Sequence, residues 1–348
     1  MRFRRFRKEA SAPAAPAPSP DEVRAEVDRL AEAGQVDAAL DLLVALHRRG
    51  QAEGCEEQIR SLRLQAGAVA REQAGRGDWP PRYDDPFPEV RGRFPEVRAG
   101  ALTTELLGGA VAHHGALIVR GALAPDQVER LAGAIEATHD SKQAEADEAS
   151  DWYQPLVEID GAVRRWVAQR GGTWLADSPR STEIVLSELE AAGIVPAIAG
   201  HLGERPVISL QKSTLRRTLP DFGIIAWHQD GSFLGDEVRT MNVWVALSAC
   251  GGDRPTPGLE ILPRRLDGVL PVDGVLSPIS VPQELVDELA QEGATIIPTF
   301  EAGDALLFDE ILLHRTHLAP EMTDVRYALE CWFFAPSQAT SSYTALLV

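Results

Sequence analysis

Residues 224–233 read IIAWHQDGSF, an apolar run that ends in a polar turn. His228 and Asp230 stand two positions apart at the end of this run, just before Gly231. In an extended chain, residues two apart project from the same face, so both side chains can reach one point in space. The pattern also fits a strand end that enters a polar turn through Asp230 and Gly231. A motif this short recurs by chance, so the rest of the chain has to decide between the two interpretations.

Short alternating segments surround this stretch throughout the C-terminal part of the chain. They lie at 206–213, 222–228, 239–248, 258–262, 294–299, 304–308, 311–316 and 325–334. Such a density of short strands, with turn residues between them, predicts a β-sandwich or barrel. A strand at 116–119, a helix that begins at Pro125 and a helix at about 181–192 precede them. The chain is therefore expected to be α+β, with its chemistry inside the β part.

The N-terminal third divides by composition. Residues 1–20 combine a basic tip, MRFRRFRK, with an Ala/Pro-rich linker and lack the apolar core of a secretory signal, which predicts disorder. Residues 21–78 carry apolar residues at helical spacing and predict a helical appendage, which packs on the main domain or on a second copy of itself. Residues 79–100 form a Pro/Gly-rich connector with a duplicated FPEVR. The main domain is expected at 101–348.

The overall charge and the cysteines exclude several classes of protein. With 34 basic and 52 acidic residues, the formal net charge is −18, which argues against nucleic acid held on a broad basic surface. No apolar run of 18 residues exists, so no membrane span is expected. Three widely spaced cysteines suggest neither a disulfide framework nor a thiolate metal site. They are expected to be small buried hydrophobes in a cytoplasmic protein.

A third candidate ligand lies 84 residues after Asp230. The segment GDALLFDEILLHRTHLAP, residues 303–320, supplies His314 at the end of another apolar run. Two histidines and one carboxylate suit non-haem Fe(II), because three coordination positions stay open. The residual positive charge of such a site can bind an anionic co-substrate. The ligands alone do not fix the metal, since divalent affinities follow the Irving–Williams order.

An arginine follows His314 by twelve residues. Arg326 opens the strand RYALECWFF and by alternation shares its face with Glu330. An arginine that points into a barrel needs an anionic partner, and a carboxylate bound bidentately by the guanidinium would satisfy it. Thr316 has the same parity as His314 and can add a hydroxyl to that carboxylate. Glu330 either holds an amine or hydroxyl of a substrate or pairs internally with a neighbouring arginine.

Together these residues resemble the phytanoyl-CoA dioxygenase family of Fe(II)- and 2-oxoglutarate-dependent oxygenases. Beside the His-Gln-Asp motif, the GDALLFDE…LLHRT segment and the downstream arginine, four stretches follow the usual order of the family: GALIVRGALAPDQVERL, HLGERPVISLQKS, MNVWVALSAC and GLEILPRR. The similarity covers about residues 100–338. It implies a double-stranded β-helix, in which two facing sheets hold the metal at one open end.

The resemblance also implies the roles of the main site residues. His228, Asp230 and His314 are expected to bind Fe(II). Arg326, with Thr316, is expected to bind the far carboxylate of 2-oxoglutarate. The stretch PRRLDG at 263–268 departs from the Pro-Gly-Ser-His sequence that the family often has after its GLEIL strand, which puts the substrate in doubt rather than the metal chemistry.

Five further residues are candidates for the walls of the site. Trp244 matches a family tryptophan that lines the co-substrate pocket, although simple sheet packing also explains it. Lys212 matches a lysine near that pocket, although a solvated strand residue has the same pattern. Glu330, Trp227 and Phe233 are candidate substrate contacts, the last two as walls of a dry pocket beside the metal.

The implied activity is that of a dioxygenase that hydroxylates a C–H bond of a small molecule, consumes 2-oxoglutarate and O2, and releases succinate and CO2. The retained Asp230 argues against halogenation, because halogenating relatives replace it with a small residue; desaturation and cyclisation stay open. Two other classes remain: a cupin-like metal-dependent hydrolase or isomerase, to which Arg326 would be superfluous, and a non-catalytic binding protein. The expected partner is a small-molecule substrate, with self-association or a protein partner through the helical N-terminus left open.

Overall fold

The computed structural model describes residues 18–73, 79–144, 150–157, 159–219, 225–234, 238–274, 277–338 and 345–348. The basic tip and most of the linker predicted at 1–20 lie outside the described residues. The chain forms two compact units, Met1–Glu53 and Gly54–Val348.

The first unit holds a helical hairpin, α1 (Pro20–Glu32) and α2 (Val36–Arg48). Ser19 starts α1 with a capping box, in which its side chain accepts from the backbone N–H of Glu22 and the Glu22 carboxylate accepts from the backbone of Ser19. Apolar side chains at helical spacing are buried along both helices, among them Val23 and Val27 of α1 and Leu40 of α2. The helical pattern that begins at residue 21 is therefore confirmed for α1 and α2.

The third helix, α3 (Glu56–Gln73), belongs to the second unit, whereas the sequence pattern assigned it to an appendage that ended at 78. It packs against α7 (Pro179–Ala191) and β11 (Ala345–Leu347). Arg63 of α3 is 2% exposed, and its Nε and Nη2 donate to the two carboxylate oxygens of Glu183 at 2.7 and 2.9 Å. Helical periodicity shows that a segment buries one face, but it does not show against which partner.

A large mixed sheet forms the centre of the second unit. Its strands follow the order β1-β2-β8-β6-β10-β4-β11, with β5 also paired to β10 and β3 to β5. Among the strand pairs that the structure describes in this sheet, β1–β2 is parallel and the others are antiparallel. The bounds of the strands not yet given are β1 Glu96–Arg98, β2 Ala116–Arg120, β3 Gly172–Trp174, β4 Val207–Ser209, β5 Thr214–Thr218, β6 Thr240–Ala246, β8 Ala305–Phe308 and β10 Arg326–Phe334.

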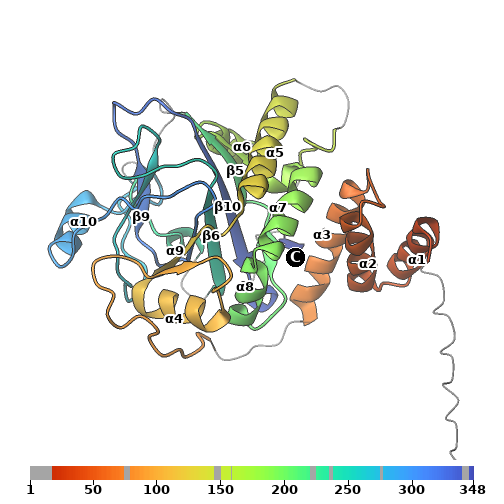
Figure 1. Ribbon diagram of the computed structural model, residues 1–348, viewed down its shortest axis with the longest axis horizontal. Coiled ribbons are helices and arrows are strands. Elements are labelled where there is room, and N and C mark those ends of the chain that lie inside the picture. Colours follow the sequence, from red (N-terminus) through yellow and green to blue (C-terminus); the bar gives the residue numbers. More distant parts are fainter. Residues whose placement is uncertain are drawn as a thin grey trace, which may run out of the picture. The chain divides into compact units, whose positions relative to one another are not determined.

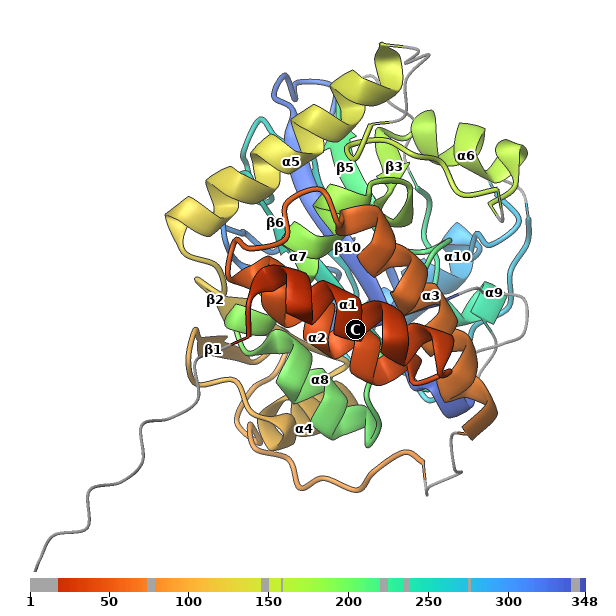
Figure 2. The same ribbon diagram turned by 90° about the vertical axis from the view of Figure 1, so that its right-hand side faces the viewer.

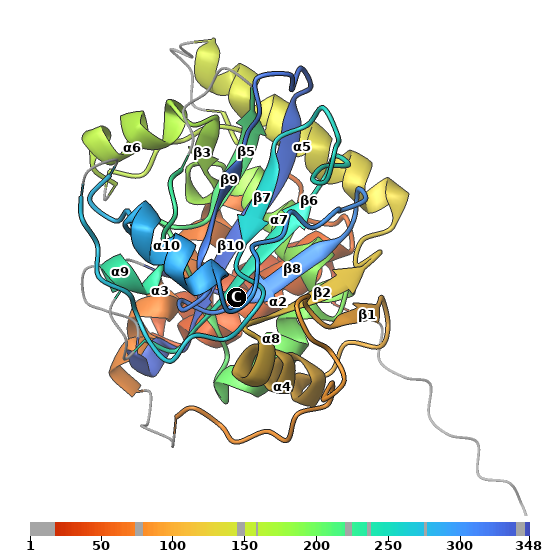
Figure 3. The same ribbon diagram turned by 90° about the vertical axis from the view of Figure 1, so that its left-hand side faces the viewer.

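A smaller antiparallel sheet, β7 (Gly258–Ile261) with β9 (His314–His317), faces the large one, as Figures 1 and 3 show. Single bridges extend it, from His228 to His314 and from Ile261 to Ile296. The two sheets make the predicted α+β double-stranded β-helix. Strands were expected at 222–228 and 294–299, but their described residues form only these single bridges. In the segment 294–299, Pro298 has no backbone N–H to donate to a neighbouring strand.

Helices cover the far face of the large sheet. In Figure 1, α5, α7 and α8 lie on the side of the large sheet opposite β9, and Figure 2 looks onto these helices, with β10 behind α7. The remaining helices of the unit are α4 Thr104–His114, α5 Pro125–Gln143, α6 Gly161–Ala168, α8 Ile194–Leu202, α9 Gly231–Leu234 and α10 Gln283–Ala290, with 3-10 turns at Leu175–Asp177 and Pro336–Gln338. No single helix in the described ranges is long and apolar enough to cross a membrane, although α7 and α8, bent by 81°, meet the length and composition requirement as a pair.

Alternation along the central strands decides which side chains face the smaller sheet. Val243 and Val245 of β6, with Leu329 and Cys331 of β10, pack into the core on the helical side. The residues between them point the other way, into the space between the sheets. Trp244 is one of these. The inner face of β10 therefore carries charged and aromatic side chains, and the functional site is built on it.

Candidate metal and co-substrate site

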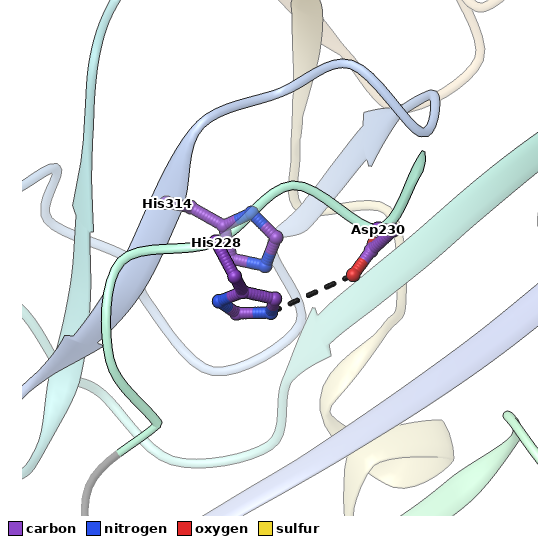
Figure 4. Close-up of side chains that lie close together, drawn as sticks. All are labelled: His228, Asp230 and His314. Carbon is purple, nitrogen blue, oxygen red and sulfur yellow. Dashed lines mark ion pairs between the residues drawn. The ribbon is translucent and has the colours of Figure 1, made fainter. Parts of the chain in front are cut away.

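Three buried side chains meet between the two sheets: His228, Asp230 and His314 (Figure 4). One ligand atom from each lies within 4.8 Å of the other two, and His228 Nε2 is 3.5 Å from Asp230 Oδ1. The backbone N–H groups of the two histidines each donate to the carbonyl of the other, at 3.0 and 3.1 Å. These two hydrogen bonds hold together segments that are far apart in the sequence.

Backbone carbonyls fix the tautomers of both histidines. Nδ1 of His228 lies 2.8 Å from the carbonyl of Ala226, and Nδ1 of His314 lies 3.0 Å from that of Leu312. A carbonyl only accepts, so each Nδ1 carries the proton and each Nε2 keeps its lone pair. Burial, with the nearby His314, lowers the pKa of His228 to about 3, and burial also lowers the pKa of His314. Both imidazoles are therefore neutral donors.

The carboxylate of Asp230 has little compensation within the chain. It is 3% exposed, and the side-chain amide of Asn242, at 3.4 Å, is its hydrogen-bond donor. Burial, and then the charge of Glu330, raises its pKa well above the ordinary value. Among the described residues it forms no ion pair with arginine or lysine. Two neutral imidazole donors beside an uncompensated carboxylate fit a divalent metal ion, whose charge would offset the buried acid.

Arg326, Thr316 and Trp244 line a small cavity of about 40 Å³ that also touches both histidines. Arg326 is 4% exposed, and its Nη1 and Nη2 donate to the Gly258 carbonyl at 3.0 Å and to the Thr218 hydroxyl at 3.4 Å. Its Nε has no acceptor, and no carboxylate pairs with it in the described part of the chain. Burial lowers its pKa to about 10. A buried guanidinium that has no acid beside it in the described residues is suited to bind an anion.

A larger cavity of about 260 Å³ opens beside the metal-ligand group, with His228 and Asp230 in its wall. Lys212, Phe233 and Glu330 also line it. The Lys212 ammonium is 3.8 Å from the centre of the Phe233 ring, and the residue is half-buried and lies in a turn, not on a solvated strand. Burial lowers its pKa, against the opposing charges of Asp230 and Glu330.

Glu330 has an internal arginine partner, the second of the two roles considered for it. Its Oε2 accepts from Arg216 Nη2 at 2.6 Å, from Arg216 Nε at 2.9 Å and from the Thr214 hydroxyl at 3.0 Å. Its Oε1 accepts from the Trp332 indole at 3.2 Å. Burial raises the pKa of Glu330, but the charge and hydrogen bonds of Arg216, with those of Thr214 and Trp332, outweigh it and bring the pKa to about 2. Glu330 is therefore ionised, and these hydrogen bonds fix the position of its carboxylate.

Trp227 does not line either cavity, contrary to the expectation that it forms a pocket wall. It is 3% exposed and packs in a separate cluster with Leu262 and Leu313. Arg315 lies over its ring at 4.9 Å. As the neighbour of His228 in an extended segment, it points to the opposite side.

Sequence reasoning missed several residues of the larger cavity. Arg216 touches both cavities, and its register partner on β10 is Ala328, two residues from Glu330. Alternation along β5 could have shown only which face Arg216 points to. Its place beside Glu330 depends on the register between β5 and β10, which the sequence of either strand does not fix. The other missed lining residues include Trp166, Val167, Trp174, Thr214, Ser277, Pro278, Ile279 and Trp332.

Comparison with known proteins gives one family match. Residues 111–254 match the model described as phytanoyl-CoA dioxygenase. This range includes His228 and Asp230 and ends before His314 and Arg326. No curated protein matches the sequence.

Several solved structures are similar in fold. EctD from S. alaskensis with bound Fe has 18% identity, a TM-score of 0.48 and coverage of 66% of this chain and 75% of that chain. AviO1 from Streptomyces viridochromogenes Tue57 has 17% identity, a TM-score of 0.43 and coverage of 66% and 94%. The non-heme alpha-ketoglutarate-dependent carbocyclase SnoK from nogalamycin biosynthesis has 16% identity, a TM-score of 0.46 and coverage of 69% and 86%.

Proposed function

We propose that the chain is an Fe(II)- and 2-oxoglutarate-dependent hydroxylase of a small molecule, because residues 111–254 match the family model described as phytanoyl-CoA dioxygenase. The proposed reaction converts 2-oxoglutarate, O2 and a C–H bond into succinate, CO2 and a C–OH group. One oxygen atom enters succinate and the other enters the product. The observation that carries the proposal is the buried group of His228, Asp230 and His314 beside Arg326, a buried cation without an acid.

The three ligand residues would hold the iron. The two Nε2 lone pairs and the Asp230 carboxylate supply three donors, which leaves coordination positions for the co-substrate and O2. When bound, Fe(II) supplies the activation of O2, which the side chains of the chain cannot perform. The protein contributes the tautomers of the histidines, set by the Ala226 and Leu312 carbonyls, and a ligand group that is 3–7% exposed.

Arg326 would hold the far carboxylate of 2-oxoglutarate. Its guanidinium faces the same small cavity as the two histidines, so one dicarboxylate can touch both ends of that cavity. The Thr316 hydroxyl lines the cavity and would add a donor, and the Trp244 ring, 5.9 Å from the guanidinium, would form a wall. A hydrolase that used the same three metal ligands would have no use for this buried cation.

The proposal is tested by anaerobic titration of Fe(II) and 2-oxoglutarate into the purified protein, with the weak visible charge-transfer band of the chelate as the readout. Wild type should develop the band. His314→Ala should lose it, and Arg326→Met should require far more 2-oxoglutarate. Arg254→Met is the control, because Arg254 pairs with Glu301 at the surface. Absence of the band in wild type, or equal titration curves for wild type and Arg326→Met, would refute the assignment.

A further inference from the structure

The larger cavity combines aromatic walls with fixed charge. Among the described residues, its lining includes the aromatic side chains of Trp166, Trp174, Phe233 and Trp332. The Phe233 and Trp332 rings are stacked, with centroids 5.9 Å apart and planes inclined by 30°. At about 260 Å³, it is smaller than most pockets for drug-sized ligands, which are about 300–1,000 Å³. It therefore suits a small molecule, or the reacting end of a larger one, with a flat apolar body.

Arg216 presents part of its guanidinium to this cavity. The residue is 8% exposed, and its Nε and Nη2 are both committed to one oxygen of Glu330. Its Nη1 has no hydrogen-bond acceptor in the described part of the chain. A guanidinium has five N–H donors in one plane. Arg216 uses Nε and Nη2 for Glu330, so the N–H groups of Nη1 can donate to a second acceptor.

A second cation, Arg170, contributes to the electrostatics around Arg216. Arg170 stacks on the Trp166 ring, with its guanidinium carbon 4.1 Å from the ring centre, and its Nη1 donates to the Trp166 carbonyl. Within the described residues it has no acidic partner, and its Nε has no acceptor. Burial, and then the charge of Arg216, lowers the pKa of Arg170. Arg170 stacks on Trp166, a wall residue of the cavity, so its charge adds to that of Arg216 in favouring a bound anion.

Glu330, by contrast, is not available as an anionic anchor. Both of its oxygens already accept hydrogen bonds, from Arg216 and Thr214 on one side and from Trp332 on the other. A cationic ligand would have to displace Arg216 and leave a buried guanidinium unpaired, at a large free-energy cost. Glu330 therefore positions Arg216 rather than the ligand.

We propose that the primary substrate is a small molecule with a flat apolar body and a carboxylate, and that Arg216 Nη1 binds this carboxylate. The inference rests on the proposed function, since the molecule in this cavity is the one to be oxidised. The aromatic walls would hold the body of the substrate. His228 and Asp230 line the same cavity, so a C–H bond of that body would face the metal site while the carboxylate stays at Arg216.

The test uses matched carboxylic acids, primary amides and amines built on phenylpropyl, naphthylmethyl, cyclohexylpropyl and hexyl bodies. Each is titrated into the metal-free full-length protein, and binding is followed by quenching of tryptophan fluorescence and by calorimetry. For at least one body, the acid should bind about tenfold or more tightly than its amide and amine. Hydrogen bonds to charged groups correspond to roughly ten- to hundredfold in affinity, and a fall of that size is expected in R216Q/E330Q.

The double variant removes both charges, so neither partner is left buried and unpaired, and its thermal unfolding verifies the fold. R216K, which keeps the ion pair with Glu330, is the second variant and should lose part of the acid affinity. R217Q is the matched control, because Arg217 lies next in sequence and pairs with Glu136 instead. Amide affinities should change less than threefold in all of these variants.

Three results would overturn the inference. One is that no acid in the panel binds more tightly than its amide and amine; another is that an amine binds most tightly, which would make Glu330 the anchor. The third is that acid affinity falls in Arg326→Met and not in R216Q/E330Q, which would place the acid in the co-substrate cavity. The chelate band in wild type is measured separately, so failure of the proposed function and failure of this inference are distinguishable.

Discussion

Replacing Arg326 by methionine should make the protein without its co-substrate more stable. Burial lowers the pKa of Arg326 to about 10, from 12.5 for a solvated guanidinium. One pKa unit corresponds to about 1.4 kcal/mol, so the buried charge costs the folded state about 3 kcal/mol. This cost is fully present at neutral pH, because both the folded and the unfolded arginine are protonated there, and it declines only as the pH rises above about 10.

Methionine has a similar volume and carries no charge. The substitution gives up two hydrogen bonds, to the Gly258 carbonyl and the Thr218 hydroxyl, each worth about 1 kcal/mol. The net gain is therefore about 1 kcal/mol, or a rise in melting temperature of roughly 1–2 °C for a unit as large as Gly54–Val348. In the presence of metal and 2-oxoglutarate the order should reverse, because only the wild type gains the free energy of co-substrate binding.

The loss of co-substrate affinity should be large. A bidentate guanidinium–carboxylate contact comprises two charged hydrogen bonds of about 1.5–3 kcal/mol each, so the 2-oxoglutarate concentration at half-saturation should rise by about a hundredfold or more. Differential scanning calorimetry, with and without anaerobic Fe(II) and 2-oxoglutarate, measures both effects. If Arg326 were only a structural residue, Arg326→Met would melt at a lower temperature without ligands and keep the full stabilisation by 2-oxoglutarate. That outcome would refute the reasoning.

Three further changes test other parts of the structure. Asn242→Leu removes the hydrogen bond to Asp230 and should weaken metal affinity about 10–100-fold, as measured by Co(II) titration; an unchanged affinity would mean that Asn242 does not orient the carboxylate. Arg63→Met should lower the free energy of unfolding in urea by about 3–5 kcal/mol by leaving Glu183 buried and unpaired, and R63M/E183M should recover most of it. Burial, with the charge of Arg265, lowers the pKa of His201 to about 4, so stability present above pH 6.5 is lost as the pH falls from about 6.5 towards 4. Melting curves of His201→Gln should show a shallower fall between pH 7 and 5 than wild type, and parallel curves would contradict this.

The metal-ligand group could be found from the sequence because its determinants are local. His228 and Asp230 are two residues apart in an extended segment, and His314 ends an apolar run of the same kind. Strand alternation, which needs no knowledge of the fold, puts Arg326 and Glu330 on one face of β10. Each of these predictions used only the spacing within a segment, and the structure brings the segments together as expected.

The remaining features depend on register and packing between segments. Arg216 belongs to the site because β5 pairs with β10 in a register that sets it opposite Ala328, and no pattern within β5 fixes that register. Trp227 was predicted to line the pocket beside His228, and this prediction was wrong. Adjacent residues of an extended segment point to opposite faces, so Trp227 points away from the face that carries His228. The assignment of α3 to the second unit depends on the buried contact of Arg63 with Glu183, which is 120 residues away in the sequence.

The inner face of β10 links the two proposed anion sites. Arg326 faces the co-substrate cavity, and Glu330, four residues later on the same strand, holds Arg216 at the larger cavity. A strand rises by about 3.3 Å per residue, so these two positions are about 13 Å apart along a rigid element paired on both sides. The separation between the two carboxylates would then be set by the paired strands β5 and β10, which carry Arg216 and Arg326, and not by loops. A substrate whose reactive carbon lies too near its carboxylate, or too far from it, would bind to Arg216 and present the wrong atom to the metal site, so chain length should decide which acids are oxidised.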